Sequence, residues 1–205
     1  MEETRSASWL TGKQVTGFGL PRGRLAKVMR RLMSRGNDPE QADVLQLLQP
    51  QAGEHIVEVG YGPGALVEAL LDAGATVTGV DPSDAMCAMA GERNQAAVEA
   101  GRAKLGVGRA EETGLPDEHA DAVVAVNNVV MWSDLTGALT ELRRILRPGG
   151  RLVVSWHGGT EPSWMARKMM LGEEALDRIR EETHAVFGAA QRHDLGHVNA
   201  FTAQR

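Results

Sequence analysis

The segment from His55 to Leu66 constrains the fold of this chain most, because it reads as a buried strand, a glycine-rich turn and the start of a helix. Gly60, Gly62 and Gly64 stand at alternate positions, where backbone N–H groups can approach a ligand that a Cβ atom would obstruct. Pro63 suits the first turn of the helix. A helix N-terminus offers unpaired donors and a positive partial charge. The segment therefore predicts a loop that holds a nucleotide-like ligand.

A second predicted strand, residues 75–81, ends in Asp81, twenty-one positions after Gly60. An acidic side chain at this place can accept hydrogen bonds from both hydroxyls of a ribose, as in nucleotide-binding βαβ units. The spacing Gly60-x-Gly62-x-x-Ala65 also satisfies the dinucleotide pattern. Glycine spacing alone therefore leaves both NAD and S-adenosylmethionine open as ligands.

Four motifs follow one another between residues 54 and 157. They are residues 58–64 (Glu-Val-Gly-Tyr-Gly-Pro-Gly), 79–86 (Gly-Val-Asp-Pro-Ser-Asp-Ala-Met), 108–116 (Gly-Arg-Ala-Glu-Glu-Thr-Gly-Leu-Pro) with 120–124 (Ala-Asp-Ala-Val-Val), and 142–150 (Leu-Arg-Arg-Ile-Leu-Arg-Pro-Gly-Gly). In order and spacing they resemble the class I S-adenosylmethionine-dependent methyltransferases, particularly the type 11 group with the ubiquinone/menaquinone-biosynthesis and small-molecule enzymes. The resemblance implies S-adenosylmethionine as the cofactor.

Length and composition agree with this resemblance. A chain of 205 residues with 42% hydrophobic content suffices for one well-buried domain, but is short for a dinucleotide domain plus a catalytic domain. This counts against an ordinary dehydrogenase. Cys87 is the single cysteine, which excludes a disulfide framework. With no secretory signal and no apolar run long enough to span a bilayer, we expect a soluble, cytoplasmic protein.

The apolar periodicity alternates between strand and helix, which predicts an α/β fold with a mainly parallel sheet covered by helices on both faces. The predicted strands are 54–60, 75–81, 103–108, 120–127, 150–157, 190–195 and 198–203, and the predicted helices are 64–73, 84–100, 134–146 and 171–187. The resemblance implies that the last two strands form an antiparallel hairpin, which completes a Rossmann-like sheet of seven strands.

Residues 1–50 are predicted to form a helical cap or lid, and residues 51–205 the cofactor-binding domain. Between Thr4 and Asn37 there are eight basic and no acidic residues, although the net charge of the chain is −5. Apolar residues follow helical spacing there, which predicts a basic amphipathic helix: Leu25, Val28, Met29, Leu32 and Met33. This helix either packs its apolar stripe on the domain, which we favour, or attracts an anionic acceptor or a membrane surface. Nucleic acid is not an expected partner, since aromatic residues are not clustered. A homodimer is allowed but not indicated.

The resemblance assigns the cofactor-binding residues to the first four strands and the loops after them. They are Glu58, Gly60, Tyr61, Gly62, Gly64, Asp81, Pro82, Met86, Ala110, Glu111 and Asn127. It places Glu58 near the cofactor amino group, Asp81 on the ribose and Asn127 beneath the sulfonium. Met86 either packs on the adenine or fills the core, and Glu111 either faces the adenine edge or closes its loop. At Arg109 the chain departs from the acidic residue that is common in the family.

His157 is the candidate general base, because it ends an apolar strand at the rim of the expected pocket, immediately before Gly158 and Gly159. The alternative is a strand-end histidine that is hydrogen-bonded to the backbone. His193 and His197 flank an expected hairpin turn without an evident third ligand, so we predict no metal site.

The predicted function is methyl transfer from S-adenosylmethionine to an N, O or C atom of a small-molecule acceptor. Two alternatives stay open at this point: a protein that keeps the same scaffold without methyl transfer, and, with less support, an NAD-dependent oxidoreductase.

Overall fold

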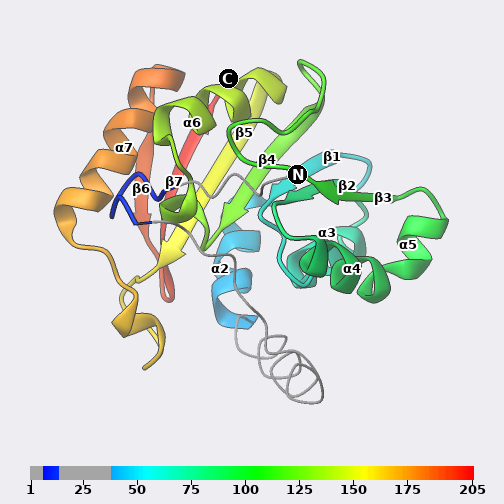
Figure 1. The fold of residues 1–205 in the computed structure, drawn as a ribbon, viewed down its shortest axis with the longest axis horizontal. Helices are drawn as coiled ribbons and strands as arrows, with labels where there is room; N and C mark the ends of the chain where they lie inside the picture. The colour runs from blue at the N-terminus through cyan, green and yellow to red at the C-terminus, as the bar shows by residue number, and fades with distance from the viewer. Residues whose placement is uncertain (1–6, 14–37) are drawn as a thin grey trace.

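A computed structural model describes residues 7–13 and 38–205. These residues form a seven-stranded sheet in the order β3-β2-β1-β4-β5-β7-β6 (Figure 1). The strands are β1 (His55–Val59), β2 (Thr76–Asp81), β3 (Ala103–Val107), β4 (Ala120–Val126), β5 (Leu146–His157), β6 (Gln191–Asp194) and β7 (Val198–Gln204). Strands β1 to β5 pair in parallel, and β7 is antiparallel to both β5 and β6. The predicted Rossmann-like sheet with an antiparallel terminal hairpin is thereby confirmed.

Helices cover both faces of this sheet (Figure 1). They are α2 (Asp38–Leu48), α3 (Ala65–Asp72), α4 (Asp84–Arg93), α5 (Gln95–Glu99), α6 (Leu135–Ile145) and α7 (Glu173–Phe187), with the 3-10 turns η1 (Val129–Met131) and η2 (Ala166–Lys168). Successive residues of a strand face opposite sides. Val57 and Val59 of β1 pack in the core with α6 and α7, whereas Ile56 packs in the core with α2, α3 and α4. Alternate side chains of β1 therefore pack into two hydrophobic cores, one on each face of the sheet.

The predicted helix 84–100 is broken at Asn94 into α4 and α5. The side chain of Asn94 donates to the carbonyl of Ala90 at 3.0 Å and to that of Gly64 at 3.1 Å. Asn94 is buried. A side chain that bonds the backbone in this way competes with the helical pattern. At this break, the Asn94 side chain therefore links the end of α4 to Gly64, the residue before α3.

Strand β5 begins at Leu146, four residues before the predicted start. Leu146 pairs with Ala120, and the next pair joins Arg151 to Ala122, so the register shifts between them. Such an irregularity lets extra residues of one strand leave the ladder and return to it. The prediction missed this extension because Pro148, Gly149 and Gly150 read as a turn.

The strand order reverses between β1 and β4, because β2 and β3 lie on one side of β1 while β4 and β5 lie on the other. Ligands of open α/β sheets bind outside the carboxyl ends of the strands at such a switch point. This topology places Gly60, Asp81, Asn127 and His157 along one edge of the sheet. We call it the carboxyl edge.

The basic amphipathic helix predicted around residues 25–33 lies outside the described residues. From the predicted cap segment, α2 packs against β4, β5 and β7. Trp9 donates its indole N–H to the carbonyl of Val129 at 2.7 Å. Within residues 7–13 and 38–205, no helix is long and apolar enough to cross a membrane.

Candidate active site

The glycine loop after β1 needs its three glycines for different reasons. All three have positive φ angles of 71°, 52° and 79° at Gly60, Gly62 and Gly64. A Cβ atom on Gly60 would collide with the Asn128 side-chain amide, and one on Gly64 would lie 2.7 Å from Nδ2 of Asn94. A Cβ atom on Gly62 would meet nothing within 4 Å. Gly60 and Gly64 thus permit packing, whereas Gly62 faces open space that a ligand can approach.

Asp81, the last residue of β2, is bonded to the glycine loop. Its Oδ2 accepts from the N–H of Gly62 and its Oδ1 from the N–H of Ser83, both at 2.9 Å. Burial raises the pKa of the Asp81 carboxyl, while these two hydrogen bonds oppose the increase. Each carboxylate oxygen has two lone pairs and uses one for these bonds. Both oxygens therefore keep an acceptor position, which suits two neighbouring hydroxyl groups.

Glu58 is a buried carboxyl in the middle of the apolar strand β1, with only 3% of its surface exposed. No donor in the described part of the chain reaches its Oε2. Burial, and then the nearby charge of Asp81, raise the pKa of Glu58 well above its usual value. An unpaired buried carboxylate is costly. The site therefore favours a ligand that brings a positive charge or an N–H donor to Glu58.

Asn127 follows β4 with a φ angle of 56°, which asparagine tolerates better than most residues. Its backbone N–H donates to the carbonyl of Ser155 at 2.9 Å, and its Nδ2 donates to Oε2 of Glu40 at 2.6 Å. Its Oδ1 is buried, and no donor from the described residues reaches it. Asn127 and Glu58, on neighbouring strands, thus each hold a buried oxygen near the switch point that is unpaired within the described part of the chain.

Tyr61, Pro82 and Met86 differ in what they present to a ligand. Tyr61 is buried, donates its hydroxyl to the carbonyl of Gly106 at 3.0 Å and packs over Gly79. Its ring thus supports the loop from beneath, and its backbone carbonyl accepts from the N–H of Gly64 at 3.0 Å. Pro82 is exposed at the end of β2, and Met86 is buried with 6% exposure in the first turn of α4.

Ala110 and Glu111 lie in the loop after β3. Ala110 is buried in the core beneath α6. Oε1 of Glu111 accepts from the N–H and hydroxyl of Ser133 at 2.5 and 2.7 Å, and from the N–H of Asp134 at 3.3 Å. Burial acts to raise the pKa of Glu111, but the hydrogen bonds from Ser133 outweigh it and lower the pKa. This arrangement corresponds to the loop-closing interpretation of Glu111.

His157, the last residue of β5, contacts a carboxylate and not the backbone. Its Nδ1 lies 2.9 Å from Oε1 of Glu40, a residue in the first turn of α2 that is 6% exposed. Glu40 is not among the site residues expected from the sequence. Its only local signal is the helix-start sequence Asp38-Pro39-Glu40, which says nothing about a partner more than a hundred residues away.

His193 and His197 have separate partners and do not converge on one point. Nε2 of His193 lies 2.9 Å from the hydroxyl of Thr202, and Nδ1 of His197 lies 3.3 Å from Oδ2 of Asp43. In the described ranges, no three His, Cys, Asp or Glu side chains are grouped as a metal ion would need.

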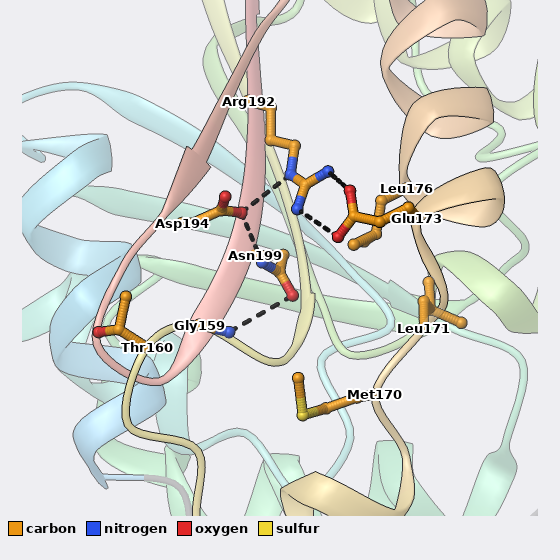
Figure 2. A pocket seen from close by; sticks show the side chains of 9 residues that line it. All are labelled: Gly159, Thr160, Met170, Leu171, Glu173, Leu176, Arg192, Asp194 and Asn199. Carbon is orange, nitrogen blue, oxygen red and sulfur yellow. Dashed lines mark hydrogen bonds and ion pairs between the residues drawn. The ribbon is translucent and has the colours of Figure 1, made fainter.

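Beyond β5, a pocket of about 230 Å³ opens at the carboxyl edge, between the start of α7 and the β6–β7 hairpin (Figure 2). Met170, Leu171 and Leu176 supply apolar atoms to its lining. Arg192 donates to Glu173 at 2.6 Å and to Asp194 at 2.9 Å, as Figure 2 shows. The guanidinium is thus already neutralised by two carboxylates, and the pocket carries no excess of positive charge.

Comparison with known proteins identifies the family. The profile described as "Methyltransferase domain" matches residues 57–154. An uncharacterized methyltransferase of Mycobacterium tuberculosis (strain H37Rv) is 32% identical over 174 residues, which are 83% of this chain and 68% of the relative. A ubiquinone/menaquinone biosynthesis C-methyltransferase of Rubrivivax gelatinosus is 32% identical over 123 residues, 60% of this chain and 46% of that enzyme.

A solved structure shows the same fold. Phosphoethanolamine N-methyltransferase 2 of Haemonchus contortus, in complex with S-adenosyl-L-methionine, superposes with a TM-score of 0.67 at 17% identity, over 87% of this chain and 56% of that one. This likeness concerns the fold; the match to the methyltransferase family is what answers the cofactor question left open by glycine spacing, in favour of S-adenosylmethionine over NAD. The glycine loop, the acidic end of β2 and these similarities lead to one conclusion: the chain belongs to the class I S-adenosylmethionine-dependent methyltransferases.

Proposed function

We propose that this methyltransferase acts on a small-molecule acceptor that binds at the carboxyl edge beside His157 and offers an N, O or C nucleophile. The observation that carries the proposal is a pair of buried acceptor atoms, Oε2 of Glu58 and Oδ1 of Asn127, that no donor within residues 7–13 and 38–205 reaches. They lie on the strands that flank the switch point. Native proteins rarely leave buried polar atoms unpaired. Both oxygens suit a cofactor that carries a positive charge and N–H donors.

The chain offers matching groups for the rest of the cofactor. S-adenosylmethionine supplies a methyl group on a positively charged sulfur, already activated for attack. The free acceptor positions of Asp81 suit the ribose hydroxyls, and Gly62 leaves room for close approach. Glu58 suits the amino group, and Oδ1 of Asn127 suits the region of the sulfonium. The main work of the protein is then to align the nucleophile and to exclude water.

His157 is the proposed general base. Its Nδ1 is hydrogen-bonded to Glu40, so Nε2 is the nitrogen that can receive a proton from the methyl acceptor. A hydroxyl acceptor benefits from this step more than a neutral amine does, since the amine is a good nucleophile before it loses a proton, whereas the hydroxyl oxygen is a weak one until its proton is removed.

The pocket between α7 and the β6–β7 hairpin is the proposed place for part of the acceptor (Figure 2). It begins at Gly159, two residues after His157, and its volume of about 230 Å³ has room for one part of a small molecule. Because Arg192 is already paired there, a preference for anionic acceptors would have to come from the basic residues of the N-terminal segment.

Titration calorimetry with S-adenosylhomocysteine, and with NADH in parallel, tests the cofactor assignment. We expect saturable binding of S-adenosylhomocysteine alone, after which methyl transfer from labelled S-adenosylmethionine to a panel of amines, phenols and carbon acids identifies the acceptor. Binding of NADH instead, or of neither ligand, contradicts the proposal.

Two sets of variants then test the acceptor site. His157→Ala is expected to reduce turnover on the acceptor while it leaves the affinity for S-adenosylhomocysteine unchanged. Unaltered turnover in His157→Ala would reject His157 as the general base. Neutralising Arg24, Lys27, Arg30 and Arg31 together is expected to weaken binding of an anionic acceptor far more than binding of cofactor. Equal effects on both ligands reject the anionic preference.

A further inference from the structure

We infer that Glu40 is a positioning residue, which sets both the tautomer of His157 and the orientation of the Asn127 side-chain amide. The functional meaning of these two orientations rests on the function proposed above. The structural inference rests on a single carboxylate that reaches two residues of the carboxyl edge.

The two oxygens of Glu40 have different partners. Oε2 accepts from Nδ2 of Asn127 at 2.6 Å, and Oε1 lies 2.9 Å from Nδ1 of His157. Asn127 and His157 end the neighbouring strands β4 and β5, whereas Glu40 belongs to α2, which packs against both strands. The carboxylate therefore bridges two strand ends from outside the sheet.

An ionised carboxylate only accepts hydrogen bonds, so each partner must present a donor to it. For His157 the donor is the proton on Nδ1, which leaves Nε2 as the acceptor nitrogen of a neutral ring. For Asn127 the donor is Nδ2, which directs Oδ1 away from Glu40. This Oδ1 is the buried atom that no donor from the described residues reaches. Glu40 thus directs one acceptor atom of each partner, Nε2 of His157 and Oδ1 of Asn127, away from itself.

Burial strengthens the hydrogen bonds that Glu40 makes. Glu40 is 6% exposed, and the side chain of His157 is 13% exposed, so water competes little for these bonds. A hydrogen bond to a charged group in such surroundings is stronger than one between neutral groups. In other enzymes, a buried aspartate accepts a hydrogen bond from Nδ1–H of a histidine and so fixes the tautomer and orientation of that general base.

The isosteric variant Glu40→Gln separates this role from simple packing. Asn127 and His157 contact different oxygens of Glu40, and a glutamine in the same place replaces one of these oxygens with an NH₂ donor, so it cannot accept at both positions. Either His157 must place its proton on Nε2, or Asn127 must turn its amide over. The first change is visible in the ¹⁵N shifts of the His157 ring, and the second in the affinity for S-adenosylhomocysteine.

The experiment records ¹⁵N–¹H long-range correlation spectra of the six histidines in the ligand-free full chain, with the His157→Gln spectrum to assign the ring. We expect the Nδ1–H tautomer for wild-type His157. In Glu40→Gln we expect either loss of that tautomer or an affinity for S-adenosylhomocysteine about tenfold lower, and in Glu40→Ala we expect both.

Asp43→Asn is the matched control, because Asp43 lies one turn further along α2 and holds the β6–β7 turn through the N–H of His197 at 2.6 Å. It should leave the His157 tautomer and the cofactor affinity as in wild type. Wild-type His157 without the Nδ1–H tautomer, unchanged readouts in Glu40→Gln, or equal effects of Asp43→Asn overturn the inference. The tautomer is read without any ligand, so failure to bind S-adenosylhomocysteine counts against the proposed function and not against Glu40.

Discussion

The backbone N–H of Gly62 donates a 2.9 Å hydrogen bond to Oδ2 of Asp81, which ties the glycine loop after β1 to the end of β2. The same carboxylate also receives the N–H of Ser83, at the turn into α4. One buried side chain therefore holds two loops of the carboxyl edge in place before a ligand arrives. Such preorganisation reduces the ordering cost of binding.

Replacing Asp81 tests this arrangement. In Asp81→Asn one oxygen becomes an NH₂ donor that faces a backbone N–H, and the acceptors offered to a ribose are reduced. We expect the affinity for S-adenosylhomocysteine to fall at least about tenfold, which corresponds to about 1.4 kcal/mol. Titration calorimetry measures it. Asp84→Asn is the control, because Asp84 is exposed in the first turn of α4. Unchanged affinity in Asp81→Asn would remove Asp81 from the ribose site.

Glu58→Gln should stabilise the ligand-free protein and weaken cofactor binding. The raised pKa of Glu58 means that the folded state holds its proton more tightly than the unfolded chain does, so stability declines as pH rises above 4.5. A neutral glutamine avoids this loss. We expect its melting temperature to exceed that of wild type at neutral pH, and the difference to disappear below pH 4.5. Scanning fluorimetry across pH measures stability, and calorimetry the affinity. A variant that is less stable than wild type at pH 7 contradicts this account.

Gly62→Ala and Gly64→Ala form a matched pair in the same loop. Both residues have positive φ, so each alanine is strained by about 1 kcal/mol. At Gly64 the new Cβ atom also collides with Asn94 and Ala90, which should lower the melting temperature considerably more. At Gly62 the new Cβ atom enters open space, so the main effect should be weaker binding of S-adenosylhomocysteine. If Gly62→Ala binds as tightly as wild type, the ligand does not pass close to Gly62.

Glu141 should stabilise the fold in a pH-dependent way. Burial acts to raise its pKa, but hydrogen bonds from Arg144 and Thr113 outweigh burial and lower the pKa to about 2. The stabilisation is therefore complete above its usual value of 4.5 and is lost as pH falls from 4.5 through about 2. We expect Glu141→Gln to lower the free energy of unfolding by about 2 kcal/mol at pH 7.

Urea unfolding at pH 7 and at pH 3 checks this expectation, because the difference between Glu141→Gln and wild type should narrow at the lower pH. Glu174→Gln serves as the control, since Glu174 is exposed on α7 and should show a small effect at both values. A difference that is the same at pH 7 and pH 3 would show that the carboxylate charge of Glu141 is not responsible.

The seven-stranded, mainly parallel sheet with its terminal antiparallel hairpin could be anticipated because the four motifs occur in family order and resemble a known fold. The glycine loop and Asp81 could be placed from spacing, since a parallel sheet brings the carboxyl ends of its strands to one edge. The helix break at Asn94 could not be predicted, because the apolar periodicity continues across Asn94. The break depends on a hydrogen bond from the Asn94 side chain to Gly64, thirty positions earlier in the chain.

Local patterns along the chain were sufficient for the α/β class, the glycine loop and most of the elements, because periodicity, glycines and an acidic strand end act over a few residues. They were not sufficient for the partners of the site residues. Tyr61 turns into the core beneath the loop, Glu111 is taken up by Ser133, and Glu40 reaches His157 and Asn127 across 117 and 87 positions. Such contacts depend on how helices pack on the sheet, and a short segment of sequence carries no information about the segment that will lie beside it.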